Sequence, residues 1–130
     1  METSVNNKCR AFTSLEQSKV LAKILPLESA DMYYERTKEE SEYKVYVGKN
    51  LAITYNLFSY RNGYTIPCWS LAALLSVLPR IDIEKEICSD DTFDYRVKAY
   101  IGDGYIGDWF DNPIDACYEM VIRLHELKML

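Results

Sequence analysis

The segment Pro67-Cys68-Trp69-Ser70 holds the side chain that is best placed to act as a nucleophile. If residues 70–78 form a helix, its N-terminus would lower the pKa of the Cys68 thiol and increase its reactivity. A cysteine nucleophile also needs a base, and His125 is the only histidine in the chain. Because no glycine-rich or polar segment flanks Cys68 to bind an oxyanion, a packed thiol beside Trp69 is the favoured interpretation. A cysteine-dependent hydrolase using Cys68 and His125 stays an alternative.

The glycines of residues 102–107 (GDGYIG) match the G-x-G-x-x-G pattern of dinucleotide-binding loops. In such loops the glycines let a strand turn directly into a helix that holds pyrophosphate. Here the next helix signal comes only at Pro113, and too little chain follows for a βαβ unit. The pattern therefore predicts hairpin and bulge glycines, and no cofactor is expected.

Two further residue sets could suggest a metal site. Asp103, Asp108 and Asp111 lie close in sequence, but their spacing does not match a calcium-binding EF-hand loop. The four cysteines lie far apart and form no C-x-x-C pair, which zinc sites usually contain. We expect turn and capping roles for the aspartates, free thiols for the cysteines, and no bound metal.

Tyrosine is over-used, with 11 of 130 residues. Tyr46, Tyr60 and Tyr100 fall on positions predicted to face solvent, where large aromatic side chains favour recognition of a protein partner. Base-stacking sheets of RNA-binding proteins also expose aromatics, but their glycine and basic residues are missing here, and the net charge is −5. The predicted binding residues are Tyr46, Arg96, Lys98, Tyr100 and Trp109.

The strand that must position most of these residues spans 93–101 (FDYRVKAYI), where apolar side chains occupy the odd positions. Since strand side chains alternate between faces, one face is predicted to be buried and the other solvated. Such a strand is typical of an antiparallel sheet covered on one side. Other strands are predicted at 43–47, 53–58, 64–66, 81–87 and 105–110, with tight turns at 62–63 and 103–104.

Three helices are expected. The first begins at Thr13 or Ser14, each of which could form a capping box, and ends before Pro26. The second, 70–78, is apolar nearly all round and is therefore predicted to be buried. The third starts with Asn112 as N-cap and Pro113 in its first turn. The fold class is a two-layer α+β domain with an antiparallel sheet of about five strands and three helices packed mainly on one face.

The chain length of 130 residues predicts one domain, 12–130, after a flexible N-terminus at 1–11. The acidic charge disfavours a general nucleic-acid binder. The first residues contain no apolar run typical of a secretory signal, and the longest apolar stretch is too short to cross a bilayer. We therefore expect a cytoplasmic protein without membrane contact.

Four local segments look familiar together: residues 12–18 (FTSLEQS), 30–34 (ADMYY), 67–71 (PCWSL) and 111–117 (DNPIDAC). With them, residues 12–130 resemble an uncharacterised family of small Bacteroides-type proteins that are often carried on prophages or conjugative elements. The resemblance implies a bacterial or phage cytoplasmic setting. It carries no known activity, ligand or catalytic residue.

The function expected from these observations is a non-enzymatic protein-interaction or accessory and regulatory domain. It would bind an unidentified protein partner, or a second copy of itself, through its polar sheet face or through the hairpin loop from Asp103 to Trp109. Besides the cysteine-dependent hydrolase, the other alternative is an acidic decoy that occupies a nucleic-acid-binding protein.

Overall fold

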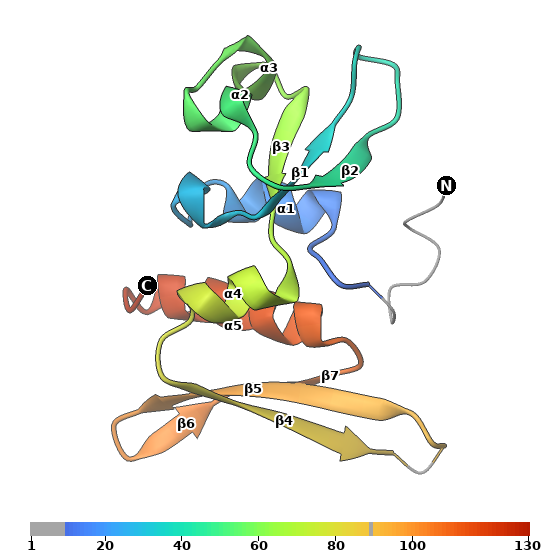
Figure 1. Ribbon diagram of the computed structural model, residues 1–130. Coiled ribbons are helices and arrows are strands. Elements are labelled where there is room, and N and C mark those ends of the chain that lie inside the picture. Colours follow the sequence, from blue (N-terminus) through green and yellow to red (C-terminus); the bar gives the residue numbers. More distant parts are fainter. Residues whose placement is uncertain (1–9, 89) are drawn as a thin grey trace. The chain divides into compact units, whose positions relative to one another are not determined.

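The computed structural model describes residues 10–88 and 90–130 (Figure 1). It confirms an α+β protein whose strands pair antiparallel. In detail, the strands form two sheets of three and four strands instead of one sheet of about five. The chain divides into two compact units: an N-terminal unit, Phe12–Ala73, and a C-terminal unit, Leu74–Leu130 with the described residues that precede Phe12.

The N-terminal unit begins with helix α1, Leu15–Leu21, which confirms the second of the two predicted caps. The Ser14 hydroxyl accepts a hydrogen bond from the backbone N–H of Gln17 at 3.1 Å, and the Gln17 side chain accepts one from the Ser14 N–H at 3.0 Å. This reciprocal pairing satisfies two backbone donors that a helix start leaves open. A short 3₁₀ turn, η2 (Leu27–Ser29), follows.

The three-stranded sheet has the order β2-β1-β3, formed by Lys44–Val47, Met32–Glu35 and Thr65–Cys68. Its central strand β1 was not predicted, because the sequence indicated only that these residues lead into a charged loop. Tyr34 is buried in β1, and its hydroxyl donates to the carbonyl of Thr13 at 2.7 Å. The core of this sheet therefore depends on a tyrosine whose polar end is satisfied.

The strand predicted at 53–58 was wrong. This segment contributes to two short helices, α2 (Leu51–Thr54) and α3 (Phe58–Arg61). The alternation of Ile53, Tyr55 and Leu57 is misleading, since only Ile53 is buried. The side chain of Asn50 caps α2 by accepting from the Ala52 N–H at 2.8 Å, which favours helix over strand at this point.

The tight hairpin predicted at Asn62-Gly63 was also wrong. Asn62 ends α3, and its backbone N–H still donates to the Phe58 carbonyl. Gly63 follows with a φ of +81°, the left-handed geometry that commonly terminates helices. The same two residue types that favour a hairpin turn therefore act here as a helix stop.

Helix α4, Leu71–Val77, leads from the N-terminal unit into the C-terminal unit and agrees with the helix predicted at 70–78. Leu74 is fully buried, whereas Ala72 and Ser76 are exposed. The helix is therefore not enclosed on all sides, although its sequence is apolar nearly all round.

The sheet of the C-terminal unit has β5 (Phe93–Ile101) between β4 (Ile81–Ile87) and β6 (Gly104–Ile106), and a short β7 (Trp109–Phe110) also pairs with β5. Helix α5, Pro113–Glu126, packs on β5 along one face of this sheet (Figure 1). The predicted alternation in β5 is confirmed at its centre, where inward-facing Val97 is 2% exposed.

Helix α5 starts as predicted. The Asn112 side chain accepts from the N–H of Ile114 at 2.7 Å and from that of Asp115 at 3.4 Å, and Pro113 occupies the first turn. Its buried face consists of Ile114, Ala116, Cys117, Met120, Val121 and Leu124.

The sequence predicts a single domain at 12–130, which means that both units are expected to fold cooperatively. This stays a prediction. Of the flexible N-terminus predicted at 1–11, residues 1–9 lie outside the described residues. Among the helices that the structure describes, none is long and apolar enough to cross a membrane.

Candidate interaction surface

The strand register gathers most of the predicted binding residues on one face of the four-stranded sheet. Alternation in β5 directs Arg96, Lys98 and Tyr100 away from the face that contains Val97. Their cross-strand partners share this side because antiparallel partners point to the same face. We call this surface the outer sheet face; the pairs that define it are Asp82–Lys98, Glu84–Arg96, Tyr100–Tyr105 and Arg96–Trp109.

Glu84 links the two cations of the outer sheet face. One carboxylate oxygen accepts from Arg96 Nη2 at 2.5 Å, and the other lies 2.9 Å from Lys98 Nζ. The hydrogen bond from Lys98 is the largest cause that lowers the pKa of Glu84, and the hydrogen bond from Arg96 is the second largest. The same hydrogen bonds raise the pKa values of Arg96 and Lys98. All three groups therefore stay charged at neutral pH and hold each other in fixed positions.

Aromatic rings lie against these cations. The Arg96 guanidinium is 4.6 Å from the centre of the Trp109 ring and 5.2 Å from that of Tyr105. Lys98 Nζ lies 4.5 Å from the Tyr105 ring. Such cation–π contacts orient flat rings without burying them. The rings remain accessible: Trp109 is 37% exposed and Tyr105 48%.

Tyr100 is held at both ends of its side chain. Its ring meets that of Tyr105 edge-on, with 6.2 Å between centres, and its hydroxyl donates to a carboxylate oxygen of Asp82 at 2.6 Å. This hydrogen bond raises the pKa of Tyr100, so the phenol stays neutral and acts as a donor. Half of its surface is nevertheless open to solvent, at 48% exposure.

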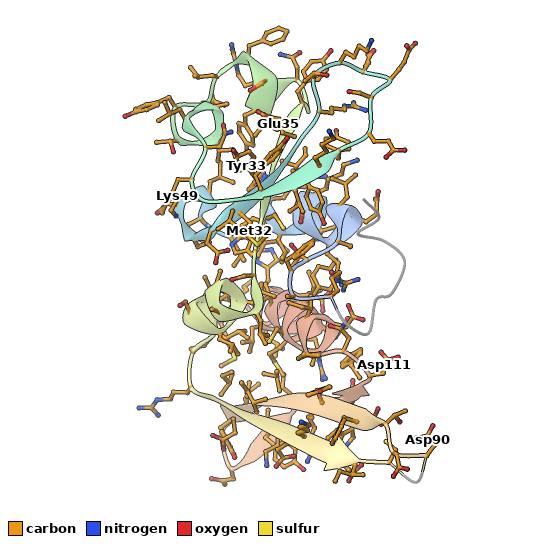
Figure 2. All side chains as sticks on the ribbon, turned by 45° about the vertical axis from the view of Figure 1, so that its right-hand side comes forward. Met32, Tyr33, Glu35, Lys49, Asp90 and Asp111 are labelled. Atoms are coloured by element: carbon orange, nitrogen blue, oxygen red, sulfur yellow. The ribbon has the colours of Figure 1, made fainter. Side chains whose placement is uncertain are left out.

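Tyr46 belongs to a different surface. It lies on β2 in the N-terminal unit, where it is 42% exposed and stacks on Tyr33, labelled in Figure 2, with 5.3 Å between ring centres. Tyr60, predicted on a wet sheet face, lies in helix α3 and is half-buried. The structure thus brings together four of the five predicted binding residues and assigns Tyr46 to the other unit.

The sequence interpretation missed Asp82 as a member of this surface, and it considered Tyr105 only as part of the alternative hairpin loop from Asp103 to Trp109. The predicted turn at Asp103-Gly104 would have paired Tyr105 with Gly102, so Tyr105 would have shared a face with Tyr100 without lying directly opposite it. The observed turn centres on Gly102-Asp103, where only Gly102 has a positive φ, +60°, as a type II′ hairpin requires of its first central residue. The observed register places Tyr105 directly opposite Tyr100.

The surroundings of Cys68 do not activate its thiol. Cys68 ends strand β3 instead of starting a helix, is fully buried, and contacts the hydroxyl of Thr13 at 3.6 Å. Burial raises the pKa of the Cys68 thiol to about 11. His125 lies in the C-terminal unit, exposed near the end of α5. A core thiol packed beside buried Trp69 is the interpretation that this environment supports.

The aspartates considered for metal binding have turn, capping and surface positions. Asp108 lies 3.5 Å from the guanidinium of Arg123, and Asp111 directly precedes the cap of α5 (Figure 2). Among the residues that the structure describes, no group of three His, Cys, Asp or Glu side chains lies close enough to hold a metal ion.

Comparison of the chain with protein-family models, with curated proteins and with solved structures finds no match. The chemistry of its surfaces is therefore the basis for inferring what it does.

Proposed function

We propose that this protein is a non-enzymatic interaction domain, with an accessory or regulatory role, that binds a protein partner through the outer sheet face. The observation that carries the proposal is the fixed array of exposed Tyr100, Tyr105 and Trp109 around Arg96 and Lys98. Tyrosine, tryptophan and arginine are the residue types that most often dominate the energy of protein interfaces.

Pre-organisation supports this role. Binding becomes less favourable by about 0.5–1.5 kcal/mol for each mobile side chain that the interface immobilises. Here Tyr100 is anchored by Asp82, and Arg96 is held between Glu84 and the Trp109 ring. A partner would therefore meet side chains that are already ordered.

The charges of this face favour a protein over a nucleic acid. Four carboxylates point to the outer face, those of Asp82, Glu84, Glu86 and Asp94, against only two cations. Both cations are engaged by Glu84, so neither is available to a phosphate without losing an existing ion pair. We infer that the partner surface combines apolar groups with lysine or arginine side chains.

The test is capture of partners from a bacterial lysate by immobilised protein, with Tyr100→Ala and Trp109→Ala as variants and Tyr55→Ala as the matched control. Tyr55 is 67% exposed but lies in the N-terminal unit. We expect the first two variants to keep the wild-type melting temperature within a few degrees and to lose at least about tenfold in affinity for the captured protein, which corresponds to 1.4 kcal/mol.

Equal capture by wild type and both variants would contradict the proposal. Tyr46→Ala, measured alongside, reports whether the second predicted surface takes part. Light scattering of the purified chain distinguishes a second copy from a foreign partner.

A second candidate, the acidic decoy, is favoured by the distribution of charge. The N-terminal unit carries seven basic and seven acidic residues, so the whole net charge of −5 belongs to the rest of the chain. A decoy would bind its partner mainly through that charge, and its affinity would fall steeply between low and physiological salt. Binding through the outer sheet face depends less on salt, because much of its contact area is aromatic.

The cytoplasmic, bacterial or mobile-element setting belongs to the same proposal. It rests on the resemblance of four sequence segments to the Bacteroides-type family. Genes adjacent to this one that encode phage or conjugation proteins would support this setting.

A further inference from the structure

Four cations converge on one depression of the N-terminal unit. Lys19 and Lys23 come from α1 and the turn after it, Arg36 follows β1, and Arg61 ends α3. None of the described residues that line this depression is acidic, and its volume is about 540 Å³. In a unit with equal numbers of acids and bases, four of the seven basic residues thus share one site. We call it the basic pocket.

The four cations of the basic pocket have no carboxylate partner in the described structure, whereas Arg96 and Lys98 of the other unit both have one. Like charges gathered in one depression repel each other unless an anion offsets them. An anionic ligand would therefore be attracted to this pocket.

Several contacts hold the Arg36 side chain in place. Its guanidinium lies 4.6 Å from the centre of the Tyr43 ring and 5.7 Å from that of Tyr64, and its Nη1 donates to the Glu39 carbonyl at 2.7 Å. Its Nε is buried and has no hydrogen-bond partner. A buried donor left unsatisfied costs about 1–3 kcal/mol. An anion in the pocket would pair with the charge of the Arg36 guanidinium as a whole.

The rest of the lining is aromatic and apolar. Tyr43 is fixed by a hydrogen bond from its hydroxyl to the Gly63 carbonyl at 2.5 Å, and Tyr60, Ile66 and Pro67 complete the wall. Small-molecule sites typically have volumes of roughly 300–1,000 Å³ and combine apolar walls with a few polar groups. A bare phosphate ion would leave most of this volume empty.

We propose that the basic pocket binds a small phosphorylated molecule that also has a flat apolar part, of the class of nucleoside diphosphates. The phosphates would lie among Lys23, Arg36 and Arg61, and the flat part would lie against Tyr43 or Tyr60. An open depression of this size matches the volume of one small molecule, whereas the binding sites of nucleic acids track several phosphates along a groove. This proposal is independent of the outer sheet face, which belongs to the other unit.

The experiment is calorimetric titration of the full chain with ADP and with pyrophosphate at about 50 mM salt, together with amide NMR shifts to locate binding. Arg61→Gln and Lys23→Gln each remove one pocket cation from an exposed side chain. Lys44→Gln is the matched control, since Lys44 is equally exposed in the same unit but does not line the pocket.

We expect ADP to bind more tightly than pyrophosphate, with amide shifts in residues 60–67. Each pocket variant should weaken ADP about tenfold, and Lys44→Gln should stay within about twofold of wild type. Tyr100→Ala should bind ADP normally, so a failure of the proposed function leaves this result intact.

Three outcomes would overturn the proposal. The first is the absence of any ADP binding at millimolar concentration. The second is equal weakening by Lys44→Gln, which would indicate diffuse attraction to the whole unit. The third is tighter binding of a single-stranded oligonucleotide to the same residues, which would make the site a nucleic-acid surface.

Discussion

At the scale of single residues, the surroundings of a side chain determine whether it is reactive, which the residue type alone does not. Cys68 follows a proline and precedes a helix, yet it is a core residue whose thiol has a pKa of about 11. Burial in apolar surroundings disfavours the thiolate, which is the reactive form. At pH 8, roughly one such thiol in a thousand is ionised.

This predicts that iodoacetamide at pH 8 leaves Cys68 unmodified in the native protein, while half-exposed Cys88 reacts faster than Cys68. Peptide mapping by mass spectrometry after a timed reaction measures both rates. In denaturant the two cysteines should react alike, which serves as the control. Alkylation of native Cys68 as fast as Cys88 would revive the hydrolase alternative.

Glu84 gives a second prediction at this scale, through the pH dependence of its ion pairs. Its pKa in the folded protein is lowered from 4.5 by Lys98 and Arg96. The stability that these pairs contribute is therefore fully present above pH 4.5 and is lost as pH falls through the lowered folded value.

An NMR titration of the Glu84 carboxyl should accordingly give a midpoint below 4.5, and Arg96→Gln should move that midpoint upward. In Glu84→Gln, stability should depend less on pH across the acid range than in wild type. A midpoint at or above 4.5 in the wild-type protein would mean that the ion pairs do not persist in solution.

At the scale of elements, the capping residues decide where helices begin. Asn112 is fully buried, and its side-chain oxygen satisfies two backbone donors at the start of α5. We expect Asn112→Ala to lower the free energy of unfolding by about 1 kcal/mol, and by up to about 2, because those donors lose their acceptor. Asn112→Ser keeps a capping oxygen and should retain most of the stability. Urea unfolding followed by circular dichroism measures both variants, and an unchanged midpoint for Asn112→Ala would contradict the capping role.

Caps also explain where element predictions failed. Asn50 caps α2 just before the stretch 53–58 whose alternation resembles a strand, and the cap outweighs the pattern. Short apolar runs satisfy helical and extended patterns equally well. The 93–101 strand was predictable because nine residues of alternation leave no helical alternative, whereas the four residues of β1 carry too little pattern to identify a strand.

At the scale of the whole molecule, the two compact units raise the question of cooperative folding. A unit of about 60 residues buries little surface by itself and is marginally stable alone, so we expect both units to unfold in one transition. Each unit holds one of the two tryptophans: Trp69, which donates to Ser29 at 2.9 Å, and Trp109.

Single-tryptophan variants, Trp69→Phe and Trp109→Phe, therefore report on one unit each. We expect the fluorescence of each variant to give the same urea midpoint as its own circular dichroism. Midpoints that differ within one variant would show that the two units unfold separately, against the single domain predicted from the chain length.

The sequence by itself determined the α+β class, the alternating strand 93–101, the capped helix after Asn112 and the separation of Arg96, Lys98 and Tyr100 from Val97. These follow from local periodicity and capping, which act over a few neighbouring residues. Only the tertiary structure decided that Tyr105 faces Tyr100, that Tyr46 belongs to a different unit, and that Lys19, Lys23, Arg36 and Arg61 line one pocket. Those facts depend on strand register and on contacts between segments distant in sequence, which local patterns do not encode.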